Sequence, residues 1–379
     1  MRVHIHSQSI IKWMAGMQVL LWATILPFTA AFPFDHHPNL IEYAPQINDS
    51  DIHGHLFKRA SDYSGLKFSS TCDAAQIQYV KDELDEIQTV LTQAKTQLRT
   101  LRRVILDREQ PRDWGTSFAD NSRLLNTWQN YFGRIYLNKY ITGDARSYTT
   151  FTTAASNMQK LIDIYDRIHK SLSGGTLSAI IHCKDDFLKY QGDNEAGQRV
   201  YKDTRDADEA TTNLVLHSMS RICHESTSAH GWNFKNAVTL KDEICICPEL
   251  FTRTKTGNKL TRYANDVSIL MGKSLNDLKS EAAAGTILHE LTHCEHILGS
   301  DKTGDQSFSF RGKTLQAYQV GNVRGLAATN VGLTLKNADT LALFALAMYY
   351  SRCDWSKGIC SEVTKVFKDE DGTYMSFDY

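Results

Sequence analysis

The chain has 379 residues, 42% of them hydrophobic, which is enough for one large domain or two small ones. Its formal net charge is −1 at pH 7. That balance argues against a nucleic-acid partner, because such proteins concentrate positive charge on one face.

The first 31 residues have the pattern of a secretory signal peptide. Arg2 and Lys12 precede an apolar run at about 13–32, and small residues near Ala31 suit a signal-peptidase site. A membrane anchor is the alternative, and the small residues that end the run argue against it. We predict that residues 1–31 are removed on export and that no later segment spans a membrane.

The next segment, 32–59, is polar, contains four histidines and ends in Lys58-Arg59. Secretory convertases cut after dibasic pairs of this kind. We interpret the segment as a propeptide, with the mature chain beginning near Ala60. An ordinary disordered N-terminal arm is the alternative.

All eight cysteines follow this segment, and an even number in an exported chain suggests up to four disulfides. Cys353 and Cys360 are the most plausible local pair. Cys245 and Cys247 should not pair with each other, because alternate positions of a strand face opposite sides. A cysteine zinc site is disfavoured, since the chain has no C-x-x-C motif.

The first part of the mature chain, 60–175, is predicted to be an α-helical layer. Apolar residues recur at spacings of three and four throughout 73–107, and again at about 120–138 and 148–172. The first of these stripes could instead be a coiled-coil surface for a partner.

The second part, 176–379, changes character. The segments "TLSAIIHC" and "AVTLKDEICICPELF" suit strands, and "QGDNEAGQRVYKDTRDADEATT" between them is interpreted as a charged loop region. Helical patterns return at 274–298, 313–329 and 337–350. The chain is therefore predicted to be α+β, with a helical layer followed by a domain that has a small sheet.

One stretch carries a recognisable chemistry. "AAGTILHELTHCEHILGSDKTGD", residues 283–305, contains the pattern H-E-x-x-H at His289, Glu290 and His293. On a helix, residues four apart share a face, so both imidazoles can reach one zinc ion, and the glutamate can serve as general base. The alternative is a solvated helix with structural histidines.

A catalytic zinc ion takes three protein ligands and keeps one open position. His296 lies about 10 Å along the helix from His289, too far to share the ion. No later histidine completes a metzincin pattern. The remaining candidates for the third ligand are Asp301, Asp305 and Asp339.

Four segments within about 240–352 match a known pattern in order: "ICICPELF" at 244–251, "AGTILHELTH" at 284–293, "AYQVGNVRGLA" at 317–327 and "KNADTLALFALAMYY" at 336–350. Together they resemble the deuterolysin group of fungal secreted metalloendopeptidases, the aspzincins, which include the peptidyl-Lys metalloendopeptidases.

The resemblance implies a zincin-like domain and a role for each matching residue. His289 and His293 match zinc ligands and Glu290 matches the general base. Tyr318 matches a tyrosine that stabilises the oxyanion, and Asp339 matches an aspartate that binds a basic P1′ side chain. The lysine-specific members have a further acidic residue where this chain has Ala342.

The third ligand departs from the family pattern G-T-x-D-x-x-Y-G. Three residues before Tyr318 stands Leu315, and Gln319 replaces the final glycine. The loop 299–312 is longer than in the family. Asp301 and Asp305 fall near the family's spacing, and of these we favour Asp305.

We therefore expect a secreted zinc metalloendopeptidase that binds one Zn²⁺ per chain, is monomeric and cleaves proteins or peptides. A catalytically inactive secreted zinc-binding protein, such as a scavenger or effector, is the first alternative. A helical interaction module that uses 73–107 is the second.

Overall fold

A computed structural model describes residues 63–107, 117–135, 148–174, 176–206, 214–216, 222–223, 229–253, 259–264 and 267–363. All of them belong to one compact unit, 58–379. The predicted signal peptide and propeptide lie outside the described residues.

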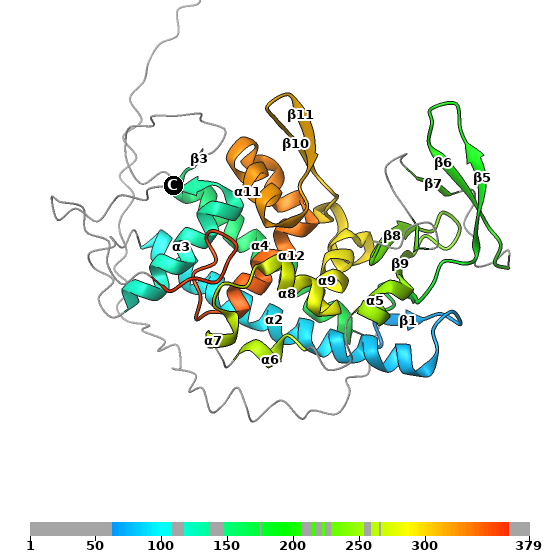
Figure 1. The fold of residues 1–379 in the computed structure, drawn as a ribbon, viewed down its shortest axis with the longest axis horizontal. Coiled ribbons are helices and arrows are strands. Elements are labelled where there is room, and N and C mark those ends of the chain that lie inside the picture. The colour runs from blue at the N-terminus through cyan, green and yellow to red at the C-terminus, as the bar shows by residue number, and fades with distance from the viewer. Residues whose placement is uncertain are drawn as a thin grey trace, which may run out of the picture. The chain divides into compact units, whose positions relative to one another are not determined.

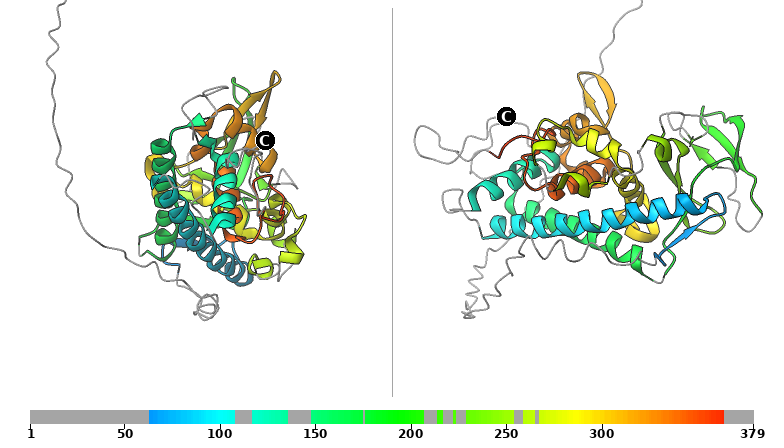
Figure 2. Two further views of the ribbon diagram at one scale, coloured as in Figure 1. Left: turned by 90° about the vertical axis from the view of Figure 1, so that its left-hand side faces the viewer. Right: turned by 60° about the horizontal axis from the view of Figure 1, so that its bottom comes forward.

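Five helices build the main core. The long helix α2 (Ala74–Leu106) packs against α4 (Phe151–Ser173), α3 (Phe118–Phe132), α9 (Ala283–His293) and α12 (Ala338–Tyr349). Figure 1 and Figure 2 show α2 running along one side of the unit with the other helices beside it. The predicted helical layer and the predicted second region thus share one hydrophobic core.

Helix α2 begins where the sequence indicates. Asp73 forms a capping box with Gln76, which satisfies backbone donors at the helix start. Leu84 and Leu91, in the middle of its apolar stripe, have no exposed area, because the stripe packs into the core of its own chain. The alternative of a partner surface along this stripe is therefore wrong.

Helix α12 lies at the centre. Its residues from Ala338 to Met348 are all buried, as expected for a helix that is apolar on every side. The hydroxyl of Tyr165 on α4 donates to the carbonyl of Leu341 at 2.7 Å. This burial fixes the position of Asp339 in the first turn of α12.

The main sheet has four strands in the order β1 (Leu66–Phe68), β4 (Ala179–His182), β9 (Asp242–Ile246) and β8 (Gly231–Lys235). The first three are parallel, and β8 pairs antiparallel with β9 at the edge. Both predicted strand segments are thereby confirmed at β4 and β9. Helix α9 packs against β8 and β9.

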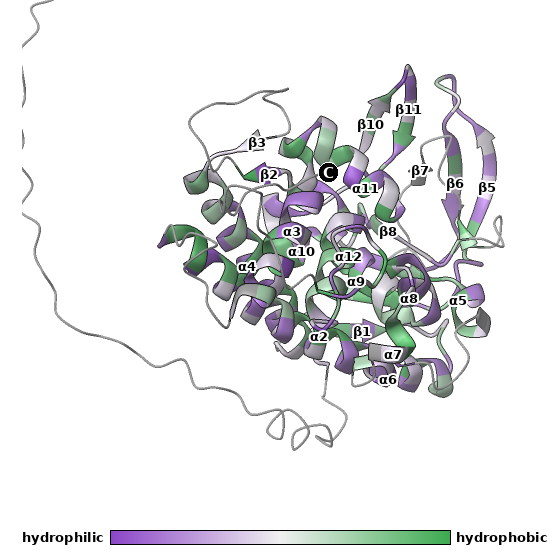
Figure 3. Cartoon of the chain, turned by 60° about the vertical axis from the view of Figure 1, so that its left-hand side comes forward, coloured by the Kyte–Doolittle hydropathy of each residue, from purple (hydrophilic) through white to green (hydrophobic). Residues whose placement is uncertain are grey.

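A second, three-stranded sheet contains β5 (Leu188–Asp193), β6 (Arg199–Asp203) and β7 (Leu214–Leu216), all antiparallel. The sequence predicted a charged loop here, and that prediction is wrong for β5 and β6. Asp203, at the end of β6, pairs with Arg205, which also binds the buried Glu243 of β9. In Figure 3 the residues of β5 are coloured as largely hydrophilic.

The segment predicted as one helix at 274–298 is three. Helix α8 (Leu275–Glu281) ends at the extended residue Ala282, and α9 ends at the extended Cys294, after which α10 (Glu295–Leu298) begins. Likewise, the predicted helix at 313–329 starts with a strand. β11 (Lys313–Gln316) pairs with β10 (Ser307–Phe310) in a hairpin, and α11 (Gln319–Thr329) follows.

The remaining described elements are short: η5 (Gly299–Asp301), η6 (Val331–Lys336), α5 (Pro248–Arg253), α6 (Thr261–Ala264), α7 (Val267–Leu270), β2 (Arg134–Ile135) and β3 (Tyr148–Thr149).

The eight cysteines form three disulfides rather than the four that the even count allowed: Cys72–Cys183, Cys223–Cys247 and Cys353–Cys360. Cys245 and Cys294 are free and buried. The predictions that Cys353 pairs with Cys360 and that Cys245 does not pair with Cys247 are confirmed. Among the described helices, none has the length and apolar character to cross a membrane.

Candidate metal centre

The pattern H-E-x-x-H lies on α9, a buried helix. Its start has no capping side chain of its own. Instead, the buried Glu83 of α2 accepts a 2.7 Å hydrogen bond from the backbone N–H of Ala284. Ile287, Leu288 and Leu291 anchor the opposite face in the main core. The two histidines are thus carried by a helix that both halves of the chain hold in place.

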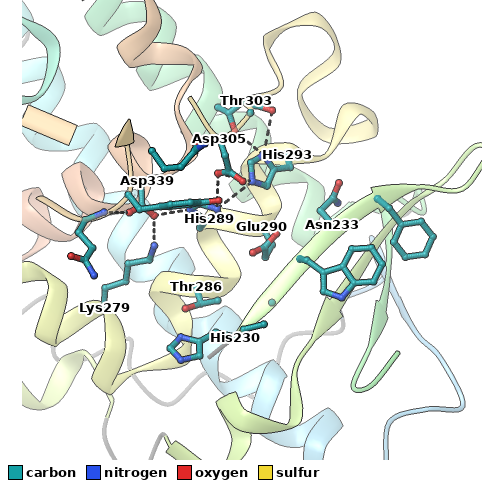
Figure 4. A pocket seen from close by; sticks show the side chains of 18 of the residues that line it. His230, Asn233, Lys279, Thr286, His289, Glu290, His293, Thr303, Asp305 and Asp339 are labelled. Atoms are coloured by element: carbon teal, nitrogen blue, oxygen red, sulfur yellow. Dashed lines mark hydrogen bonds and ion pairs between the residues drawn. The ribbon is translucent and has the colours of Figure 1, made fainter. Parts of the chain in front are cut away.

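Three ligand atoms converge on one point (Figure 4). The Nε2 atoms of His289 and His293 are 3.2 Å apart, and Asp305 Oδ1 lies 3.3 Å from the first and 3.6 Å from the second. Tetrahedral ligands at zinc bond lengths of about 2.05 Å stand about 3.3 Å from one another. The triangle therefore has the size that one small metal ion requires.

The other ring nitrogens are engaged by the protein. His289 Nδ1 lies 2.8 Å from Asp339 Oδ1, and His293 Nδ1 lies 3.3 Å from the carbonyl oxygen of Thr303. When Nδ1 donates its proton to such an acceptor, Nε2 is left to bind a metal and the ring orientation is set. Both imidazoles are arranged as ligands.

The ionisation of the histidines follows from these neighbours. Burial and the charge of Lys279 lower the pKa of His289, but the carboxylates of Asp305 and Asp339 outweigh them and raise it to about 9. Burial lowers the pKa of His293 to about 4, together with the charge of His289. A metal that binds here must displace the proton from His289 Nε2.

The two loop aspartates have different surroundings. Asp305 faces the imidazoles, as favoured from the sequence. Asp301 instead pairs with Lys160 at 2.8 Å and Arg167 at 2.6 Å, both on α4. Because two cations hold its carboxylate against another helix, Asp301 is not part of the metal centre.

The longer loop is explained by the β10–β11 hairpin. It separates Asp305 from Tyr318 in the sequence, yet its paired base brings them together, and Ala317 N–H donates to the Gln306 carbonyl at 2.8 Å. Phe308 fixes the hairpin to α11, where only Gly325 leaves room for its ring: a Cβ there would lie 2.5 Å from Phe308 Cζ. Asp305 can thus stand thirteen residues before Tyr318 and still reach the same site.

Glu290 lies beside the triangle and is buried. Burial raises its pKa to about 7, although the charge of His289 opposes the shift. Gly231 on β8 makes room for it: a Cβ at Gly231 would stand 3.3 Å from Glu290 Cγ. A carboxyl with a pKa near neutrality is suited to accept and return a proton.

His289, Glu290 and His293 also form a group whose ligand atoms lie within 4.8 Å of one another, so this cluster could hold a metal ion.

Tyr318 stands at the open side of the site, with 40% of its surface exposed and its ring centre 6.0 Å from that of His289. Withdrawal of its hydroxyl from water and the charge of Asp305 raise its pKa well above the ordinary value. The phenol therefore keeps its proton and can donate a hydrogen bond.

Asp339 has a different environment from the one that the resemblance implies. Its side chain is 2% exposed, and it accepts hydrogen bonds from His289 Nδ1, from the Lys279 ammonium and, at 2.6 Å, from the backbone N–H of Gln319. Despite burial, these donors keep its pKa far below the usual range. It faces the imidazole, and its charge is already paired within the chain.

Gln319 has a left-handed backbone with φ +64°. This is the position where the family pattern has glycine, the residue that adopts such a conformation without strain. The strained conformation aims the Gln319 N–H at Asp339. Gln319 thus adopts a backbone conformation that a glycine would adopt without strain.

A pocket of about 1180 Å³ opens over the site and is lined by both polar and apolar residues. The edge strand β8 forms one wall, and α8 with Tyr318 and Gln319 forms another. Figure 4 shows Thr286 and His230 below Glu290. The pocket is large enough for several residues of an extended peptide.

Sequence reasoning missed four residues that shape the site: Lys279, Gly231, Thr303 and Glu83. The signal for them is weak, because each acts through a contact between elements distant in sequence. A scan against models of known protein families and a search of curated proteins each found no match to this chain.

Proposed function

We propose that this protein is a secreted zinc-dependent metalloendopeptidase with a zincin-like domain of the deuterolysin kind. The observation that carries the proposal is the triangle of His289, His293 and Asp305 with Glu290 beside it. Two imidazoles and a carboxylate are a donor set typical of catalytic zinc, and three protein ligands leave a fourth position free.

A bound zinc ion would supply Lewis acidity and would acidify a water molecule to a pKa of about 7. The protein's own residues supply the rest. Glu290 takes a proton from the attacking water and later gives it to the leaving amine. Tyr318 donates a hydrogen bond to the oxygen on which negative charge develops. Asp339 and Thr303 keep the imidazoles oriented.

Export is supported by two features. The N-terminal pattern is that of a signal peptide, and three of the four possible disulfides are formed.

The substitution Glu290→Gln tests the proposed chemistry directly. The mature protein should cleave unfolded casein, a chelator should stop it, and Glu290→Gln should reduce kcat by about 10²–10⁴-fold while one zinc per chain is retained.

Glu295→Gln is the matched control. Glu295 lies five residues further along, pairs with Lys235 and Lys302, and does not line the pocket. This variant should keep full activity. Stoichiometric zinc without cleavage of any protein would reject the peptidase and favour the inactive zinc-binding alternative.

A further inference from the structure

Lys279 occupies a position in the pocket that the catalytic chemistry does not require. It lies on α8 and its ammonium pairs with Asp339 Oδ1, the same oxygen that faces His289 Nδ1. The Lys279 side chain is 19% exposed and lines the pocket, whereas Asp339 is 2% exposed. Figure 4 shows the lysine reaching Asp339 from below in this view.

The zinc helix is shaped to receive this side chain. A Cβ at Gly285 would stand 2.8 Å from Lys279 Cγ and 3.3 Å from its Cα. Gly285 precedes His289 by four residues and therefore lies on the same face of α9. Because Gly285 has no side chain, the aliphatic part of Lys279 can pack against α9 and place its ammonium group at Asp339.

The charge of Asp339 is thereby neutralised from within the chain. Three donors bind its two oxygens: Lys279, His289 and the Gln319 backbone. A ligand cation entering from the pocket would meet the ammonium of Lys279 before any free carboxylate oxygen of Asp339. Like charges repel each other, and the repulsion is screened less where the groups are largely buried.

We propose that Lys279 is a built-in counter-ion of Asp339, which it holds against His289, and that it excludes lysine and arginine side chains of the substrate from this part of the pocket. The second half of this inference rests on the proposed function. The enzyme accordingly selects neutral or acidic residues at the substrate position beside α8.

The first test does not depend on catalysis. Lys279→Ala leaves a channel that ends on an Asp339 without its lysine counter-ion, so n-propylammonium should bind there and raise Tm in a saturable manner, while n-propanol should not. The wild type and Lys302→Ala should show no such effect, because Lys302 is a pocket lysine that pairs with Glu295 instead. Equal responses of all three proteins to n-propylammonium would overturn the proposal.

The second test uses cleavage. Peptides carry one lysine, or its neutral analogue norleucine, at successive positions of a neutral sequence. At every position, the wild type should cut the lysine peptide no faster than the matching norleucine peptide. Lys279→Met, which keeps the stem and removes the charge, should gain at least tenfold in kcat/KM for lysine over norleucine at one position, since a charged hydrogen bond to Asp339 becomes available.

Lys279→Arg keeps the charge and should behave as the wild type. A wild-type enzyme that already prefers lysine would overturn the exclusion. If n-propylammonium binds Lys279→Ala but no protein in the series cleaves any peptide, the counter-ion role stands and the peptidase assignment fails.

Discussion

At the scale of single residues, the third ligand is decided by neighbours rather than by spacing. Asp301 and Asp305 stand four residues apart in one loop, and both fit the interval that follows His293. Lys160 and Arg167 bind the first, whereas the second faces both Nε2 atoms. The two cations that form ion pairs with Asp301 lie on α4, more than a hundred residues away in the sequence.

This difference predicts that the same substitution has a large effect on metal affinity at Asp305 and a small one at Asp301. Asp305→Asn removes an anionic ligand, so zinc affinity at neutral pH should fall by at least 100-fold, more than is typical for outer-shell partners. Asp301→Asn should leave the affinity within a factor of three and lower stability by less than about 1 kcal/mol, since its ion pairs are partly exposed. Competition with a chromogenic chelator measures both, and equal losses would contradict the assignment.

At the scale of secondary structure, the centre is assembled from elements that support one another. Helix α9, which carries the two histidines, has no cap in its own sequence, and α2 provides one through Glu83. The β10–β11 hairpin carries Asp305 at one end of its base and Tyr318 beyond the other. An insertion in the loop is compatible with the site because a hairpin returns the chain to where it left.

The Glu83 cap predicts a pH-dependent stability. Burial raises the pKa of Glu83 from 4.5 to about 7, although the Ala284 N–H opposes the shift. The folded state therefore holds this proton more tightly than the unfolded state, and the stabilisation from Glu83, complete below pH 4.5, is lost as pH rises to 7. Glu83→Gln cannot ionise and its amide oxygen can still accept from Ala284.

Relative to the wild type, Glu83→Gln should thus become more stable as pH increases from 4.5 to 7, and the difference should level off above pH 7. Urea unfolding at several pH values measures it. Glu295→Gln is the control, because the pKa of Glu295 in the folded protein is about 2 and this residue stays ionised from pH 4.5 to 7. A constant difference between Glu83→Gln and the wild type would show that Glu83 does not titrate there.

At the scale of the whole molecule, one hydrophobic core and one disulfide, Cys72–Cys183, join the two predicted regions. Cys72 and Cys183 are 111 residues apart and link the start of α2 to the end of β4, while Cys353–Cys360 closes a loop of only seven. A cross-link limits the unfolded chain more when the loop it closes is longer.

Replacing Cys72 and Cys183 by alanine should therefore cost about 4–5 kcal/mol of unfolding free energy, and the same change at Cys353 and Cys360 clearly less. Denaturant unfolding measures the loss of unfolding free energy in both variants.

Without reductant, a thiol reagent should label two thiols per chain, Cys245 and Cys294, and it should label them only after denaturation, since both are buried. Rapid labelling of the native protein would contradict this arrangement.

Much of the fold could be predicted from local patterns. The helix at 73–107, the strands at β4 and β9 and the pairing of Cys353 with Cys360 each depend on residues close in sequence, whose spacing or propensity is visible directly. Breaks at Ala282 and Cys294 could not be predicted, because neither is a helix breaker and both backbones are set by packing. The strands β5 and β6 were missed because their frequent charged residues favour a loop, whereas the ladder between the two strands forms only in the folded chain.

The sequence by itself determined that two imidazoles and a glutamate share one helix, since a helical period places residues four apart on the same face. Only the tertiary structure decided which aspartate completes the triangle, which glutamate caps the helix and which lysine holds Asp339. Those contacts join α2, α4, α8 and the hairpin to α9, and no local pattern encodes a distance between segments that meet only when the core has formed.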